Sequence, residues 1–224
     1  LTRAGDSRNV YEAIEHCVSK GQSAGPDGTR PSDLSKQERW SLAAFLGEQI
    51  KNKSFRPQET REVRISKGGN RGYRTIQVQN FSDRSVERSL LQIIRPYIDV
   101  VIGRGYENVR SGMPTEEMLA IAERIMLTTD RKVCVSVDAK NAFDNVPRTR
   151  LLAVLRHSIG NQEVVEFLDH VTRKSTSETR KGIKQGGPLS PWLLETYFRW
   201  TLEKWWNDNF PDTPLLWFVD DFLA

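Results

Sequence analysis

The chain has 224 residues, enough for one large domain or for two subdomains with a real core. Its 33 Lys and Arg residues exceed its 29 Asp and Glu residues, so the net charge is +4, which permits a nucleic-acid partner without demanding one. The 2 cysteines exclude a disulfide framework and a zinc site built on cysteine pairs, and no apolar run is long enough to span a bilayer.

Hydrophobic periodicity predicts helices and one hairpin in the first half of the chain. Residues 8–20 carry apolar side chains at helical spacing. Ser35 and Glu38 have the spacing of a capping box at the start of a second helix. Alternating residues around a basic, glycine-rich tip predict a β-hairpin over 57–78. Asp83 is then the expected N-cap of a third helix.

In the second half, predicted helices alternate with short strands. A helix follows Pro114, and an apolar strand covers 133–138. Further helices open at Pro147, cover 162–172 and open again at Pro191. Because helices and hairpins are interleaved irregularly, the pattern favours an α+β fold over a doubly wound parallel sheet.

Two apolar segments each end in aspartate. The strand over 133–138 ends at Asp138, and residues 215–219 run into Asp220 and Asp221. Divalent cations take oxygen ligands, so two such acidic sites could converge on the metal ions of a phosphoryl-transfer reaction. Taken alone, the Asp-Asp pair fits an acidic turn on the surface better, because such pairs are common.

Three longer stretches resemble the motifs of reverse transcriptases, most closely those of the bacterial group II intron-type lineage. Residues 137–146 (VDAKNAFDNV) are similar to the first catalytic motif, residues 182–191 (GIKQGGPLSP) to the central motif, and residues 218–221 (FVDD) to the Y-x-D-D box. Residues 24–28 (AGPDG) are similar to the early G-x-D-G signature, and residues 61–84 to the fingers segment. The order and separation of these motifs make the resemblance specific.

The chain also departs from the family pattern. Phe218 stands where tyrosine is usual, and Glu195 stands where asparagine is usual. Lys184 and Gln79 each take the place of a proline. None of these changes removes an expected metal ligand.

The resemblance implies a two-metal site. Asp138, Asp220 and Asp221 would be catalytic and would bind two Mg²⁺ ions, with Mn²⁺ as an alternative, and the carbonyl of Ala139 would add one oxygen. The ions would bind the triphosphate and activate the 3′-hydroxyl of the primer. Because successive strand side chains face opposite ways, both carboxylates of the Asp-Asp pair can serve only if the turn allows it.

The resemblance also implies nucleotide-binding residues. Phe143 would be the floor under the sugar that excludes a 2′-hydroxyl, although an ordinary core aromatic is the alternative. Gln185 and Gly186 would lie in a turn that approaches the template and nucleotide closely. Lys67 and Arg74 on the hairpin would contact the triphosphate, or else be solvated charges.

We therefore expect an α+β fold with the fingers and palm of a right-hand polymerase and no thumb. Residues 1–130 would form the fingers with N-terminal helices, with part of the palm beginning near residue 85 as an alternative. Residues 131–224 would form the palm, a small antiparallel sheet backed by helices, truncated just after the D-D box. Asp138 would lie on one strand, and the Asp-Asp pair at a hairpin turn.

The expected function is RNA-directed DNA polymerisation, with an RNA template, a DNA primer and dNTPs as partners. The motifs do not separate it from a template-independent or protein-primed relative in phage defence. An inactive RNA-binding scaffold is also open, although such relatives typically lose an aspartate and this chain has all three. Phe143 argues against a viral RNA-dependent RNA polymerase.

The biological setting stays open among intron mobility, CRISPR spacer acquisition, retron synthesis and phage defence. We expect a cytoplasmic bacterial protein without membrane attachment. Because the chain stops just after the D-D box, we also expect it to be a piece of a longer protein, with further domains or an associated protein as partners.

Overall fold

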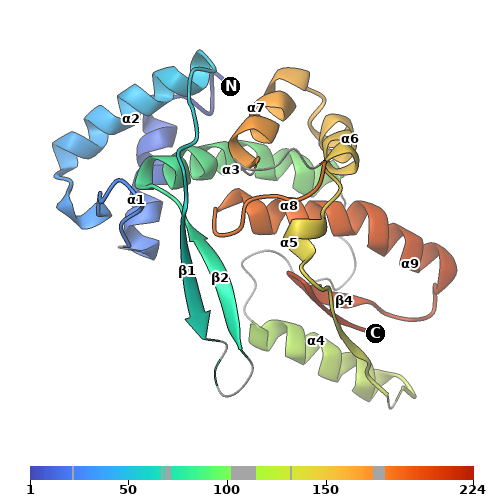
Figure 1. Ribbon diagram of the computed structural model, residues 1–224. Helices are drawn as coiled ribbons and strands as arrows, with labels where there is room; N and C mark the ends of the chain where they lie inside the picture. Colours follow the sequence, from blue (N-terminus) through green and yellow to red (C-terminus); the bar gives the residue numbers. More distant parts are fainter. Residues whose placement is uncertain (22, 67, 69–71, 102–114, 132, 174–179) are drawn as a thin grey trace.

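The computed structural model describes residues 1–21, 23–66, 68, 72–101, 115–131, 133–173 and 180–224. Helices and short strands follow one another in an irregular order (Figure 1). The elements are α1 (Ser7–Lys20), η1 (Pro31–Asp33), α2 (Lys36–Lys51), β1 (Arg61–Ser66), β2 (Tyr73–Val78), α3 (Phe81–Val101), α4 (Thr115–Thr128), β3 (Ser136–Asp138), α5 (Ala142–Asn145), α6 (Arg148–Ile159), α7 (Gln162–Thr172), α8 (Leu189–Phe198), the π-helical η2 (Arg199–Glu203), α9 (Lys204–Asn209), β4 (Leu216–Phe218) and β5 (Asp221–Leu223).

The two predicted N-terminal helices are confirmed. Asp6 caps α1 because its carboxylate accepts hydrogen bonds from the backbone N–H groups of Arg8 and Asn9. Ser35 and Glu38 form the predicted capping box at the start of α2. Both helices pack against the long helix α3, and Figure 1 shows α1 and α2 at one end of the molecule, with α3 running from them towards α6 and α7.

Helix α3 begins earlier than predicted. It starts at Phe81, so Asp83 lies inside its first turn, and the prediction that Asp83 is the N-cap is wrong. Phe81 is only 1% exposed. Burial of its ring stabilises a helix that begins at this residue, because the first turn then packs in the core. The Asp83 carboxylate instead accepts a hydrogen bond of 3.0 Å from the backbone N–H of Gln58.

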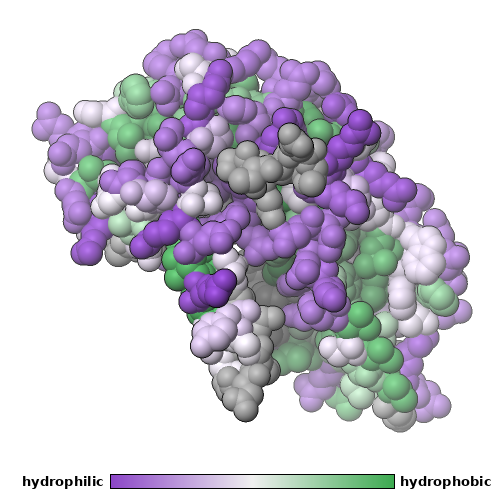
Figure 2. Space-filling view, in the orientation of Figure 1, coloured by the Kyte–Doolittle hydropathy of each residue, from purple (hydrophilic) through white to green (hydrophobic). Residues whose placement is uncertain are grey.

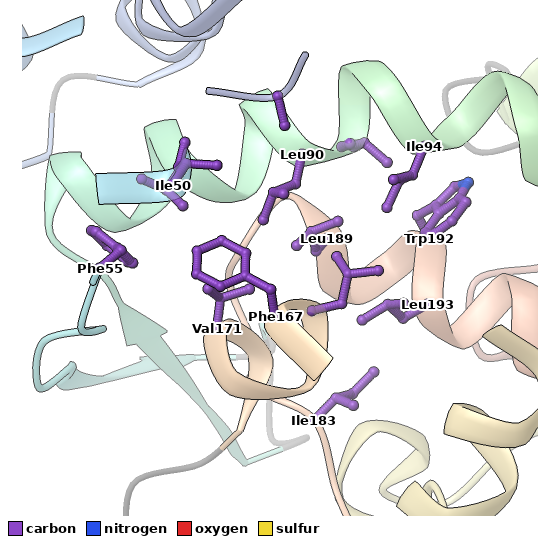
Figure 3. Close-up of a cluster of buried hydrophobic side chains, with 14 of the residues drawn as sticks. Ile50, Phe55, Leu90, Ile94, Phe167, Val171, Ile183, Leu189, Trp192 and Leu193 are labelled. Carbon is purple, nitrogen blue, oxygen red and sulfur yellow. The ribbon is translucent and has the colours of Figure 1, made fainter. Parts of the chain in front are cut away.

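The main hydrophobic core lies where α3 meets α1, α2, α6, α7 and α8. Leu90 and Ile94 contribute from α3, Leu189 and Leu193 from α8, and Phe167 from α7 (Figure 3). All five side chains are buried. This core holds the start of α8 in place, directly after the glycine-rich motif.

The described strands form a two-stranded and a three-stranded antiparallel sheet. Strands β1 and β2 form the predicted hairpin, with Arg61 opposite Val78 at its base, and Figure 1 shows it projecting from the helices. The other sheet has the strand order β3-β5-β4. Regular pairing covers only the last part of the predicted strand over 133–138, although Val135 also exchanges two backbone hydrogen bonds with Ala224. The α+β prediction is confirmed.

The surface is mostly hydrophilic in the view of Figure 2, with apolar colour over the region of α4. Strand β3 is at the edge of its sheet, and the side chains of Val133, Val135 and Val137 around it are each more than half exposed. Asp138 at the end of β3 is likewise exposed. The end of this strand is therefore open to solvent.

Candidate active site

Two aspartates lie on one face of the β3-β5-β4 sheet. In the antiparallel register, Asp138 on β3 is the partner of Asp221 on β5, and Phe218 on β4 is the other partner of Asp221. Residues directly opposite one another on neighbouring strands have side chains on the same face. The carboxylates of Asp138 and Asp221 are therefore neighbours, although the two residues are far apart in the sequence.

A two-residue turn places Asp220 beside this pair. Val219 and Asp220 connect β4 to β5, and Val219 has a φ of 59°. A positive φ at the first turn residue is typical of the type II′ hairpin turn, and it is strained for a β-branched side chain. The backbone N–H of Ala139 donates a hydrogen bond of 2.9 Å to the carbonyl of Asp220. The turn is thus tied to the residue that follows Asp138.

The first and central motifs lie side by side. The backbone N–H of Ile183 donates to the carbonyl of Phe143 at 2.9 Å, and the N–H of Gly182 donates to the carbonyl of Val146 at 2.8 Å. Phe143 is half-buried and packs against the main core. The core packing that was the alternative is therefore present, and the role of Phe143 as the floor under the sugar stays a prediction.

The structure also brings Gln185 to a residue for which the sequence indicated no role. The side-chain amide of Gln185 donates to the Oδ1 atom of Asp144 at 3.4 Å. Asp144 follows Phe143 in the first motif, and this position in the motif was the only sequence signal for it. A long, exposed hydrogen bond of this kind orients Gln185 only weakly.

Glycines allow the central motif to pack tightly against the β1-β2 hairpin and α3. Gly186 has a φ of 97°, and a Cβ atom there would overlap the carbonyl oxygen of Gln77 on β2. At Gly187 a Cβ atom would overlap Oε2 of Glu87 on α3. We expect the backbone at these glycines to approach a template or nucleotide closely. In this structure it lies close to β2 and α3 of the protein itself.

Comparison with known families identifies the chain. Residues 65–224 match the family model described as reverse transcriptase (RNA-dependent DNA polymerase). The chain belongs to the reverse transcriptase family. No curated protein matches the chain significantly.

Two solved structures support the reverse transcriptase fold. Two chains of Cas6-RT-Cas1–Cas2 complexes, one of them described as partial, each align with a TM-score of 0.59 and 16% identity over 98% of this chain. The aligned region is 37% of the length of one of these chains and 23% of the other. Apo telomerase from Candida tropicalis, truncated from its C-terminal domain, aligns with a TM-score of 0.46 and 14% identity over 82% of this chain and 48% of the telomerase. The predicted fingers–palm fold is confirmed.

The metal ligands of this reverse transcriptase chain stay a prediction. Asp138 and Asp221 offer oxygen donors on one face, which suits Mg²⁺ because phosphates and water complete its coordination shell. Within the described ranges, no group of three or more His, Cys, Asp or Glu side chains is placed to hold a metal ion. The carbonyl of Ala139, a predicted ligand, accepts a 3.1 Å hydrogen bond from the N–H of Ala142 and keeps a second lone pair.

The hairpin residues predicted to contact the triphosphate are only partly described. Lys67 lies outside the described residues. Arg74 lies on β2 opposite Ile65, and this register position is what the structure establishes about it. Among the described helices, none combines the length and apolar character that a membrane crossing requires.

A buried polar cluster lies behind the Gln185 turn. We define the Glu87 cluster as Gln79, Asp83, Glu87 and Lys184, each at most 4% exposed. Burial raises the pKa of the Glu87 carboxyl to about 7, lowers the pKa of Lys184 and raises the pKa of Asp83. Sequence reasoning missed Glu87, because a glutamate in a helix usually faces solvent.

Proposed function

We propose that this chain carries the nucleotide-adding site of an RNA-directed DNA polymerase, which extends a DNA primer on an RNA template with dNTPs. The observation that carries the proposal is the pairing of Asp138 with Asp221, beside the turn that holds Asp220, in a member of the reverse transcriptase family. Grouped oxygen donors suit the divalent cations that phosphoryl transfer needs.

The aspartates would act as metal ligands. Asp138, Asp220 and Asp221 would hold two Mg²⁺ ions, or Mn²⁺ as an alternative, and Ala139 would add its carbonyl oxygen. Bound there, the ions supply charge stabilisation for the triphosphate and a more acidic 3′-hydroxyl. The chain itself contributes preorganisation, because strand register and the strained turn hold the acidic groups before substrate arrives.

Residues of the first and central motifs would select the nucleotide. Phe143 would fill the space of a 2′-hydroxyl and so favour dNTPs. Gln185 and Gly186 would contact the nucleotide from the central motif. Backbone hydrogen bonds join this motif to the segment that carries Phe143. Lys67 and Arg74 would reach the triphosphate from the hairpin, where the arginine fork suits phosphate oxygens.

We also propose that the chain works within a larger assembly. Two structurally similar chains are longer and come from complexes described as Cas6-RT-Cas1–Cas2. Further domains of the same polypeptide, or an associated protein, would complete the enzyme. The group II intron-type lineage rests on the sequence motifs.

The test is primer extension by the full-length protein. A poly(rA)–oligo(dT) template–primer, dTTP and Mg²⁺ should give extension, and the double variant Asp220→Ala/Asp221→Ala should abolish it. Failure of the intact protein to extend, while it still binds the RNA, would contradict the proposal. Assays without template and with a protein primer would then test the relatives that polymerise in those ways.

A further inference from the structure

The strongest unexplained feature is the Glu87 cluster, which joins three segments of the chain. Gln79 follows the end of β2, Glu87 lies on α3, and Lys184 immediately precedes Gln185. Leaving a carboxylate and an ammonium group in the interior costs free energy unless each is well partnered. A buried group of this kind therefore calls for an explanation beyond stability.

The Glu87 carboxylate bonds both the fingers and α8. Its Oε1 atom accepts a 2.7 Å hydrogen bond from the side-chain amide of Gln79. Its Oε2 atom accepts a 3.3 Å hydrogen bond from the backbone N–H of Leu189, the first residue of α8. One side chain thus connects the base of the hairpin to the end of the turn that carries Gln185.

The turn itself lies directly against this carboxylate. Gly187 has no room for a Cβ atom because Oε2 of Glu87 lies there, and Gly186 has none because the carbonyl oxygen of Gln77 lies there. The turn is therefore enclosed between α3 on one side and β2 on the other. A shift of either contact would move the backbone of Gln185.

Two residues that differ from the family pattern, Gln79 and Lys184, both act on the Glu87 carboxyl. Gln79 and Lys184 stand where prolines are usual, and a proline has neither a side-chain donor nor a charge. In this chain Gln79 donates a hydrogen bond to Glu87, and the positive charge of Lys184 favours the ionised form of the Glu87 carboxyl. The backbone N–H of Lys184 also donates to the carbonyl of Thr172 at 3.1 Å, a bond that proline cannot make.

We propose that Glu87 is a positioning residue for nucleotide binding, which holds the turn of Gln185, Gly186 and Gly187 at a set place relative to the fingers hairpin. This inference rests on the proposed function. Glu87 is 1% exposed and acts through the backbone of the turn, without touching substrate. The 3.4 Å bond to Asp144 orients the Gln185 side chain only weakly, so the backbone position decides where its amide lies.

The variants separate positioning from general stability. Glu87→Ala removes both hydrogen bonds. Glu87→Gln can bond both partners: its oxygen accepts from the N–H of Leu189, and its N–H donates to Oε1 of Gln79 once the Gln79 amide turns over, which reverses that bond. Ser89→Ala is the matched control, because Ser89 is also fully buried on α3, donates to Ala4 and accepts from Asn9, away from the turn.

Steady-state extension kinetics of the full-length protein give the first readout. Glu87→Ala should raise the KM for dTTP about tenfold, the effect of losing its two buried hydrogen bonds, with kcat and template–primer affinity nearly unchanged. Glu87→Gln should restore the KM, and Ser89→Ala should leave it unchanged. An unchanged KM in Glu87→Ala, or a loss of kcat shared with Ser89→Ala, would overturn the inference.

Hydrogen–deuterium exchange gives a readout that needs no activity. In Glu87→Ala, amides over 182–190 should exchange about tenfold faster than in the wild-type protein, while Glu87→Gln and Ser89→Ala should match it. If the wild-type protein extends no primer, the proposed function fails, and exchange alone decides the positioning role. Unchanged exchange over 182–190 in Glu87→Ala would overturn that role.

Discussion

Asp138 on β3 lies directly opposite Asp221 on β5, and the next residue, Ala139, donates its backbone N–H to the carbonyl of Asp220. One strand end therefore sets the place of both residues of the Asp-Asp pair. A shift of the register by one residue would turn Asp221 to the opposite face. The acidic site depends on this pairing as much as on the identity of its side chains.

Neutralising a member of the acidic pair should abolish nucleotide addition. In Asp138→Asn and in Asp221→Asn we expect kcat to fall at least about 100-fold, because one ionised oxygen donor is lost where the metal ions would bind. Asp208→Asn is the control, since Asp208 is exposed on α9 and forms an ion pair with Lys204 across one helical turn. Primer extension with normal circular dichroism would check this, and near-normal rates in Asp138→Asn would contradict the site.

A methyl group at Gly186 should displace the turn. Gly186→Ala should raise the KM for dNTPs about tenfold or more, because its Cβ would overlap the carbonyl of Gln77. Gly160 also has a positive φ, of 66°, but has open space around it, so Gly160→Ala should cost only about 1 kcal/mol of stability. Extension kinetics and denaturant unfolding of both variants test this contrast, and equal effects on KM would refute it.

The buried carboxyl of Glu87 should make stability depend on pH. Burial raises the pKa of Glu87 from 4.5 to about 7, so between these values the folded protein binds more protons than the unfolded chain. The free energy of unfolding should therefore fall as pH rises from about 4.5 to about 7, by about 3 kcal/mol at most. Two neighbouring charges act on the pKa of this carboxyl in opposite directions, since Lys184 lowers it and Asp83 raises it.

Denaturant unfolding of the wild-type protein and Glu87→Gln across this pH range measures the contribution. The variant should show a smaller slope, because its amide does not titrate. Some slope of the same sign should remain, since burial also raises the pKa of Asp83. Curves that run parallel for the two proteins would show that Glu87 does not titrate in this range.

Shortening Phe143 should weaken discrimination between deoxynucleotides and ribonucleotides. In Phe143→Val we expect the ratio of kcat/KM for dTTP over UTP to fall about tenfold, because the space for a 2′-hydroxyl opens. Phe143→Tyr keeps the ring and should keep the preference. Phe143 also packs on the core, so a lower melting temperature with unchanged selectivity would assign it to packing alone.

Local sequence determined much of the secondary structure. The capping box of Ser35 and Glu38, the hairpin over 57–78 and the left-handed Gly160 at the end of α6 depend on near neighbours, and the structure contains all three. Propensity and capping act over a few residues, so the amino-acid order suffices to predict such features. The motifs over 137–146, 182–191 and 218–221 likewise suffice to indicate the family.

Tertiary structure decided the contacts between distant residues. Asp83 carries the sequence signature of an N-cap, but burial of Phe81 moved the start of the helix. Nothing near Glu87 in the sequence indicates that it bonds Leu189, which lies 102 residues away. The pairing of Asp138 with Asp221 also depends on strand register, and register is set by packing of the whole sheet, which no local pattern encodes.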